Sequence, residues 1–461
     1  MPPFFVLIVA IFISTLPLPA MSACNIQTDS DYLYSHTNAK QKAMLTFYYD
    51  SLCKPGQVDL SHIELPPNAS ASEQALYYFG LKNLRKYEGL RTPRIPDLLS
   101  LGDGSRIEWV SAEATLNKAI HLIESDLLLE GEFLLHEVVP IARDIGYKRL
   151  LGRTYRWLGN VKIQRSNLKS SLSYYKTAYE VMTEIGDNFQ TTMTLNNIAT
   201  VYMQSEEWKR ANKYIKRALD LYQKHGYDNS LFEAIMYSNA SAIYFALGKE
   251  ERSEQYMLKA LKEADKTGSN KIKFSTLSNM SQRYSDVGNS QEALKLARQC
   301  IEESQALDTK SNITLATCYE AYAEASFVAR DYQKSIDYAK RVIEVLHTSE
   351  SNEVVWEIQT LETLVKAYEA QGDYQQALAY MKQQSQVRQN FYRQTYDDEI
   401  LSEKNALERQ LNKREIELLE AQNELQQTKL RSQRTREILF ITLFFALAYL
   451  VIRRLWKMKR I

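Results

Sequence analysis

The chain of 461 residues carries 57 lysines and arginines against 56 aspartates and glutamates, a formal net charge of +1. This balance leaves no overall field to draw the protein onto nucleic acid, so a nucleic-acid partner is not expected. The hydrophobic content of 45% is ample for a core, and no collagen-like or low-complexity composition is present.

Residues 1–23 are predicted to be a secretory signal peptide. An apolar run at residues 4–16 is followed by prolines and small residues up to Cys24. This order is typical of an export signal, although no lysine or arginine precedes the apolar run. Residues 21–24, Met-Ser-Ala-Cys, also resemble a bacterial lipobox. Lipidation of Cys24 therefore remains an alternative to simple cleavage.

Residues 24–104 are predicted to form a helical cap that precedes the repeats. One helix is expected over residues 38–53 and a second over residues 72–87, with a proline-containing loop between them. A stack of repeats needs an atypical first unit that covers its exposed core. Capping is therefore the simpler interpretation, and a small separate element is the alternative.

A helix-turn-helix unit recurs through the middle of the chain. Residues 194–221 contain two apolar blocks at helical spacing on either side of a polar turn. Units of this kind recur with a period of about 40 residues, which places Ala178, Ala218 and Ala260 at equivalent positions. Because two such helices cannot bury their apolar faces alone, the units should stack. The prediction is an all-α solenoid over residues 105–393, with about seven units of which the first is degenerate.

The units resemble tetratricopeptide repeats in the residues around the turn. That family places a Leu-Gly or other small pair on the first helix and glycine at the turn, as in Leu158-Gly159 and in Gly248, Gly288 and Gly372. The period is longer than the standard one of about 34 residues and is similar to the extended repeats of kinesin light chains and of several bacterial regulators. The resemblance implies a right-handed superhelix whose inner wall is lined by the first helices.

After the repeats, one long helix is predicted because residues 397–436 contain neither proline nor glycine. Leu411, Leu418 and Leu425 recur every seven residues within it. This heptad spacing suggests a coiled coil over residues 394–436, and through it a homodimer. A solvated single helix is the alternative, since several polar residues interrupt the seam.

A membrane span is predicted next, over residues 437–456. It includes the uncharged stretch at residues 438–452, and the residues that follow are strongly basic, including the tail at 457–461. Positive residues favour the cytoplasmic side of a membrane. The expected location is the inner membrane, with a single pass, the repeats exported to the periplasm and the C-terminus in the cytoplasm.

Four cysteines, Cys24, Cys53, Cys300 and Cys318, would meet an oxidising compartment in an exported chain, which favours disulfides. Cys24 and Cys53 flank the first predicted helix, while Cys300 and Cys318 belong to helices expected to be neighbours in the stack. The connectivity stays open, with two buried free thiols as the alternative for the second pair. No Cys-x-x-Cys spacing is present, so neither a metal nor a redox site is expected.

No pattern of catalytic residues is visible in the sequence. Its six histidines show no HExxH spacing, and none of its 15 glycines belongs to a phosphate-binding loop. The sequence therefore predicts a protein that is not an enzyme and binds no cofactor.

Asn197, Asn239 and Asn279 occupy the same place in three consecutive first helices. In peptide-binding tetratricopeptide domains an asparagine at this place binds the backbone of an extended ligand, and the resemblance implies the same partner-binding role here. Alternatively, these side chains bond to the neighbouring first helix and hold the stack together. Further inner-wall candidates are Arg153, Asn160, Thr200 and Gln282.

The order of signal peptide, repeats, coiled coil and span resembles the sensory half of bacterial transmembrane receptors, without their cytoplasmic output domain. The first hypothesis is a membrane-anchored adaptor or sensor that binds a protein or peptide in its groove and signals through a separate partner. The alternative is a scaffold for envelope assembly that has no signalling role.

Overall fold

The computed structural model describes residues 32–38, 41–84, 107–125, 127–306, 312–348, 354–391, 393, 428–429, 431–436 and 438. The predicted signal peptide, Cys24 and most of the predicted coiled coil and membrane span lie outside these residues. The chain divides into two units, Met1–Gln386 and Val387–Ile461, and the described residues of the second unit are helical. Within the described ranges, no helix combines the length and the apolar composition of a membrane span.

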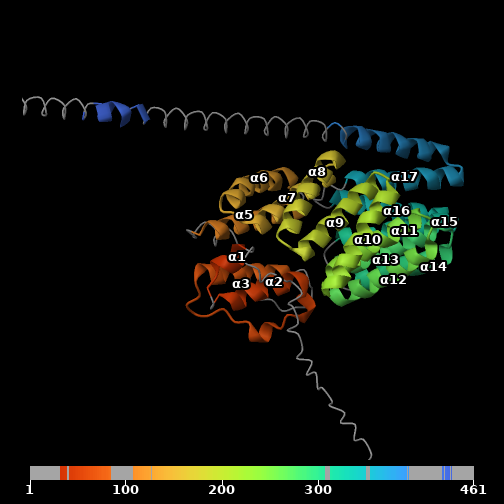
Figure 1. Cartoon of the computed structure of the whole chain (residues 1–461). Helices are drawn as coiled ribbons and strands as arrows, with labels where there is room; N and C mark the ends of the chain where they lie inside the picture. The colour runs from red at the N-terminus through yellow and green to blue at the C-terminus, as the bar shows by residue number, and fades with distance from the viewer. Residues whose placement is uncertain are drawn as a thin grey trace, which may run out of the picture. The chain divides into compact units, whose positions relative to one another are not determined.

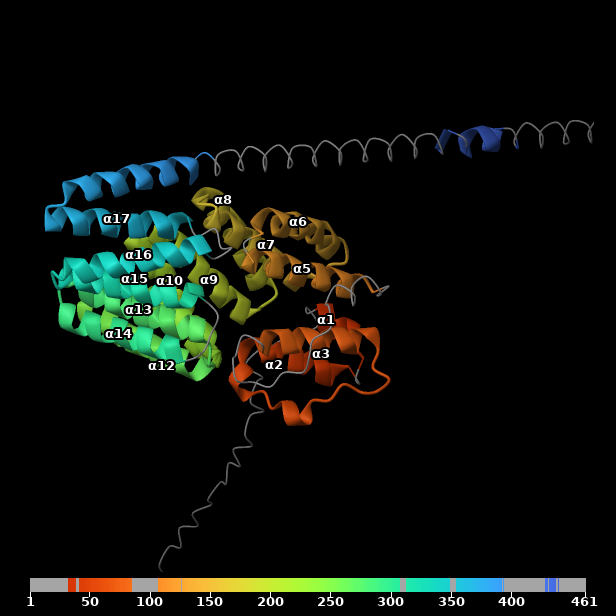
Figure 2. The ribbon, with the colours of Figure 1, turned by 180° about the vertical axis from the view of Figure 1, so that it is seen from behind.

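The array in the first unit consists of helix pairs. The first helices are α5 (Glu108–Glu124), α7 (Lys148–Gln164), α9 (Asn188–Gln204), α11 (Ser230–Ala246), α13 (Asn270–Asp286), α15 (Asn312–Val328) and α17 (Val354–Gln371). The second helices are α6 (Leu128–Asp144), α8 (Leu168–Glu184), α10 (Trp208–His225), α12 (Glu250–Thr267), α14 (Ser290–Ala306), α16 (Tyr332–Thr348) and a last helix, of which residues 374–386 belong to this unit. Figures 1 and 2 show these pairs following one another. The all-α solenoid is therefore confirmed in the described part of the chain, which contains no strand.

Small residues allow the two helices of a pair to approach closely. A Cβ atom at Gly159 of α7 would lie 2.4 Å from the ring of Tyr175 on α8, a distance too short for any real contact. In the next pair, Ala199, Tyr202 and Ala211, which belong to the two apolar blocks of residues 194–221, are all buried. The side-chain pattern of the sequence therefore corresponds to the packing between helices.

In six of the seven pairs, the turn contains one described residue with a left-handed backbone, one or two positions after the first helix ends. Glycine occupies this place in three pairs, with φ of +69° at Gly248, +75° at Gly288 and +83° at Gly372. Other pairs place Ser166, Glu206 and Arg330 there, at φ of 58°, 56° and 61°. Because a left-handed backbone is unfavourable for residues with a Cβ atom, the packing of the helices must impose this turn.

The head, defined as residues 32–84, contains α1 (Tyr32–His36), α2 (Lys42–Cys53) and α3 (Ala71–Leu84). The helix expected from residue 38 thus begins at Lys42. The second begins at Ala71, one residue before the predicted Ser72. There Ser70 and Glu73 form a capping box, in which the Ser70 backbone N–H donates to the Glu73 carboxylate at 2.8 Å.

The head contacts the connector between α10 and α11, far along the chain. The backbone N–H of Asp228 donates to the Cys53 carbonyl at 3.0 Å, and Asn229 Nδ2 donates to the Leu52 carbonyl at 2.6 Å. Gln57 Nε2 also donates to Asp228 Oδ2 at 2.7 Å. A head that covered only the first helix pair, α5 and α6, would not make these contacts. The head therefore also lies against the middle repeats.

A disulfide joins Cys300 of α14 to Cys318 of α15, with their Cα atoms 5.4 Å apart. It connects the second helix of one pair to the first helix of the next, and both residues are fully buried. Cys53 is disulfide-bonded as well, while Cys24 lies outside the described residues.

Candidate functional site

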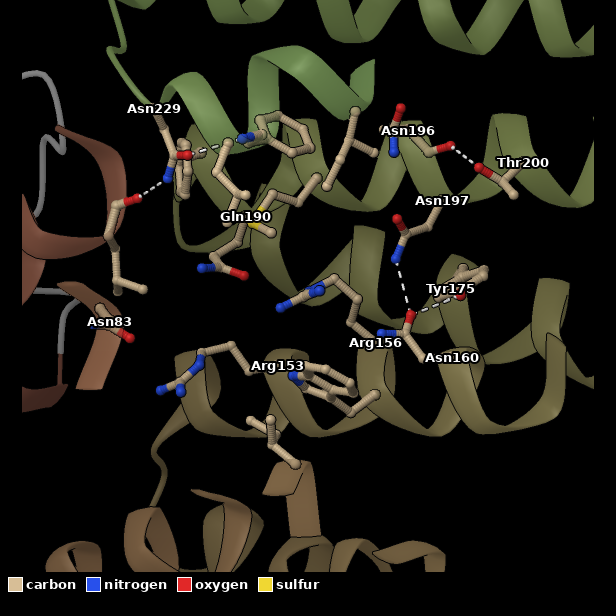
Figure 3. Close-up of a pocket in the computed structure, with 18 of the residues that line it drawn as sticks. Asn83, Arg153, Arg156, Asn160, Tyr175, Gln190, Asn196, Asn197, Thr200 and Asn229 are labelled. Carbon is tan, nitrogen blue, oxygen red and sulfur yellow. Dashed lines mark hydrogen bonds between the residues drawn. The ribbon is translucent and has the colours of Figure 1, made fainter. Parts of the chain in front are cut away.

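A concave pocket of about 410 Å³ lies between the head and the first helices α5, α7, α9 and α11 (Figure 3). Eight carboxamide side chains line it: Asn83, Asn117, Asn160, Gln164, Gln190, Asn196, Asn197 and Asn229. The aromatic residues of its wall are Trp157, Tyr175, Phe189 and Phe232. Its charged lining residues are Lys82, Arg153 and Arg156, and none of the described residues that line it is an aspartate or glutamate.

Two of the three predicted asparagines link consecutive first helices. Asn197 Nδ2 donates to Asn160 Oδ1 at 3.0 Å, which joins α9 to α7. Asn239 Nδ2 donates to Asn196 Oδ1 at 3.0 Å and to Thr200 Oγ1 at 3.3 Å, which joins α11 to α9. These bonds have the geometry of the stacking role that the sequence left open.

The three asparagines do not face one pocket. Only Asn197 lines the concave pocket. Asn239 and Asn279 line a separate cavity of about 170 Å³ between α11 and α13, and the Asn279 side chain is exposed. A continuous groove along the three side chains is therefore not seen, and their binding role stays a prediction.

Three of the four further candidates, Arg153, Asn160 and Thr200, line the concave pocket. Gln282 does not line it, and its Nε2 instead lies 3.5 Å from Glu324 Oε1. Sequence reasoning missed Arg156, although it lies on the same face of α7 as Arg153 and Asn160. The three residues recur at helical spacing, and this polar stripe was the available signal.

Arg153 belongs to a buried network that joins the head to the first two repeats. Its Nη1 lies 2.7 and 2.9 Å from the two carboxylate oxygens of Glu113 on α5 and donates to the Tyr48 hydroxyl of α2 at 2.8 Å. The Tyr147 hydroxyl donates to the same carboxylate at 2.8 Å. All four side chains are buried, so this ion pair is largely removed from water.

Arg149, one turn before Arg153, is also paired. Its Nη1 lies 2.9 Å from Oδ2 of Asp187, the residue that caps α9, and both side chains are buried. The guanidinium carbon is 4.6 Å from the ring centre of Tyr49 on α2. Arg149 therefore helps to hold the head, α7 and α9 around the pocket.

Arg156, the third of these arginines, has a different environment. Its residue is only 7% exposed, yet its Nε has no hydrogen-bond partner and no described carboxylate forms an ion pair with it. Two causes lower the pKa of its guanidinium to about 10: burial, which is the larger, and the positive charge of the nearby Arg153. Gln190 faces the same pocket, 3% exposed, and its Oε1 likewise lacks a partner among the described residues.

Two partly buried carboxyl groups of α15, outside the concave pocket, titrate near neutral pH. Burial is the larger cause that raises the pKa of Glu320 to about 8, and the negative charge of Glu324 is the second. Burial is also the larger cause that raises the pKa of Glu324 to about 7, and the negative charge of Asp286 is the second. The ordinary value for both is 4.5, so the folded protein binds more protons than the unfolded chain between these values.

Raising the pH from about 5 to about 8 is therefore expected to lower the free energy of unfolding, because Glu320 and Glu324 lose protons that the folded state binds more tightly than the unfolded chain. Urea denaturation of wild type and Glu320→Gln at both pH values measures the effect. Glu320→Gln should show the smaller pH dependence, because the amide resembles the protonated acid. Glu369→Gln, an exposed change on α17, is the control. Equal pH dependence in all three proteins would contradict the assignment.

Comparison with protein families finds tetratricopeptide repeats in four stretches. The matches cover residues 150–224, 234–267, 274–307 and 360–391. These stretches correspond to helix pairs of the array. No curated protein sequence matches the chain at a significant level.

Two solved structures share the fold. A Rap protein complexed with competence and sporulation factor superposes with a TM-score of 0.57 at 10% identity, over 77% of this chain and 98% of that one. The apo form of RapI superposes with a TM-score of 0.52 at 14% identity, over the same shares, 77% and 98%. The repeat period, the helix pairs and the family matches together identify this chain as a tetratricopeptide-repeat protein.

Proposed function

We propose that this protein binds a segment of a protein or peptide in its concave pocket. The observation that carries the proposal is the composition of the pocket wall, which combines eight carboxamides with four aromatic side chains. A carboxamide offers both a donor and an acceptor to a peptide group, and aromatic side chains supply apolar contact area. This chemistry suits a polypeptide main chain with at least one apolar side chain.

The size of the pocket agrees with such a ligand. Its volume of about 410 Å³ falls within the range of about 300–1,000 Å³ for ligand pockets, enough for a few residues of a chain. A Rap protein with a similar fold is complexed with competence and sporulation factor, which supports a ligand-binding role for an array of this kind. No catalytic step is part of the proposal.

We further propose that binding is relayed at a membrane, with the protein as an exported, membrane-anchored sensor or adaptor that acts through a separate partner. The predicted signal peptide, coiled coil and span support this part. A scaffold for envelope assembly would need the same pocket but no relay. The identity of the captured partners distinguishes the two roles.

Crosslinking pull-down from membranes tests the binding site with a matched pair of variants. Asn197→Phe adds bulk inside the concave pocket, whereas Asn279→Phe adds it at the equivalent place of a repeat outside the pocket. We expect Asn197→Phe to reduce partner capture about 10-fold or more, the loss of one well-made contact, and Asn279→Phe to leave it unchanged. Circular dichroism checks that both variants fold. Full capture by folded Asn197→Phe would overturn the assignment.

A further inference from the structure

The three charged side chains of the pocket wall, Lys82, Arg153 and Arg156, differ in whether they have a hydrogen-bond or ion-pair partner among the described residues. Arg153 is held by Glu113, and Lys82 Nζ donates to the backbone and side-chain oxygens of Asn117 at 2.9 and 3.0 Å. For Arg156, the described carboxylate that acts on it most is Asp187, which already pairs with Arg149. Buried charges in proteins are normally paired and hydrogen-bonded, so Arg156 departs from the rule at the pocket wall.

Near the Arg156 guanidinium, the pocket also contains a hydrogen-bond acceptor without a described donor, the side-chain oxygen of Gln190. Figure 3 shows Arg156 on α7 and Gln190 on α9 extending into the space between their helices. Gln190 Oε1 is buried and has no donor among the described residues. A group that accepts from Arg156 and donates to Gln190 would satisfy both. A carboxylate with a nearby amide N–H, as in a polypeptide, has this combination.

We propose that Arg156 is the subsite for a carboxylate of the bound polypeptide, with Gln190 receiving an adjacent N–H. The inference rests on the proposed function, because it names the chemical group that the pocket selects. A guanidinium binds a carboxylate through two parallel hydrogen bonds. The carboxylate belongs either to the C-terminus of the ligand or to an aspartate or glutamate side chain.

A phosphate group fits this subsite less well than a carboxylate. It carries a charge of about −1.5 to −2 and three acceptor oxygens, whereas the pocket offers one arginine without a carboxylate partner. The Gln190 oxygen would also face those oxygens without a donor between them. The absence of acidic residues among the described lining residues favours an anion of either kind, and the count of donors selects the carboxylate.

Degenerate fluorescent hexapeptide libraries test the subsite with the full-length protein in detergent micelles. One library has a free C-terminal acid and no aspartate or glutamate, a second is amidated but contains both residues, and a third is amidated and lacks both. Fluorescence polarisation should show that wild type binds at least one acid-bearing library about 10- to 100-fold more tightly than the third, as expected for a charged hydrogen bond.

Arg156→Gln should abolish this preference, because the amide side chain carries no positive charge to pair with a carboxylate. Arg156→Lys, which keeps the charge, should retain part of the preference, and Arg217→Gln on the exposed face of α10 should retain all of it. The preferred acid-bearing library shows whether the carboxylate comes from the C-terminus or a side chain.

Three results would contradict the carboxylate subsite, its assignment to Arg156 or the proposed peptide binding itself. Equal binding of all three libraries by wild type would overturn the carboxylate subsite and leave peptide binding in place. An acid preference that survives in folded Arg156→Gln would move the subsite away from this residue. Binding of none of the libraries would overturn the proposed function together with the inference drawn from it.

Discussion

Glu113→Ala is expected to lower the free energy of unfolding by about 3–5 kcal/mol, the cost of breaking a buried ion pair from one side. The substitution leaves Arg153 buried without its carboxylate and removes the acceptor of the Tyr147 hydroxyl. It also places a second unpaired guanidinium beside Arg156. Chemical denaturation followed by circular dichroism measures the loss.

The double variant Glu113→Leu/Arg153→Met is the matched control. Removing both charges leaves no unpaired ion, so it should recover most of the stability that either single substitution loses. Because Tyr48 of α2 belongs to the network, hydrogen exchange in α2 should rise more in Glu113→Ala than exchange in α16. A loss below about 1 kcal/mol, the level of an exposed pair, would show that the pair is not buried in solution.

Arg156→Met is expected to change stability in the opposite direction, raising the free energy of unfolding by about 1–4 kcal/mol. The guanidinium is buried, lacks a described carboxylate partner and lies near Arg153, which contributes to its lowered pKa of about 10. An apolar side chain of similar length avoids the cost of removing this charge from water. Thermal or urea denaturation of the ligand-free protein measures the gain.

Arg156→Lys separates charge from shape, because it keeps the cation and should not stabilise the protein. Arg217→Met, on the exposed face of α10, should leave stability nearly unchanged. A destabilised Arg156→Met would show that the arginine has an internal partner and is structural. A stabilised variant that has also lost the acid preference would show that stability is exchanged for ligand recognition at this position.

The helices and their stacking follow from local patterns in the sequence. Apolar residues at helical spacing, small residues such as Gly159 and Ala199, and a regular repeat period were sufficient to predict the α-solenoid. These features act between residues that are near in sequence or in adjacent repeats, where geometry is nearly the same in every pair. The left-handed turns were predictable only where glycine occupies them, since Ser166, Glu206 and Arg330 carry no such signal.

Most of the site was decided by tertiary structure. The bond from Asn229 to Leu52 spans 177 positions of the sequence, and that from Arg153 to Tyr48 spans 105. No local pattern encodes such contacts, because they depend on where the head folds back onto the array. For Asn197 and Asn239 the sequence left a stacking role open as the alternative to ligand binding, and the bonds to preceding first helices were identified only with the neighbours in place.

Sequence alone therefore determined that this chain is an α-solenoid, and it pointed to Arg153 and Asn160 as residues of the inner wall. The tertiary structure decided that the head closes one side of the pocket, that Glu113 pairs with Arg153 and that Arg156 lacks a carboxylate partner among the described residues. The physical reason is that a side-chain pattern reports how a helix buries its own apolar face. Whether a buried polar group is satisfied depends on atoms supplied by distant segments.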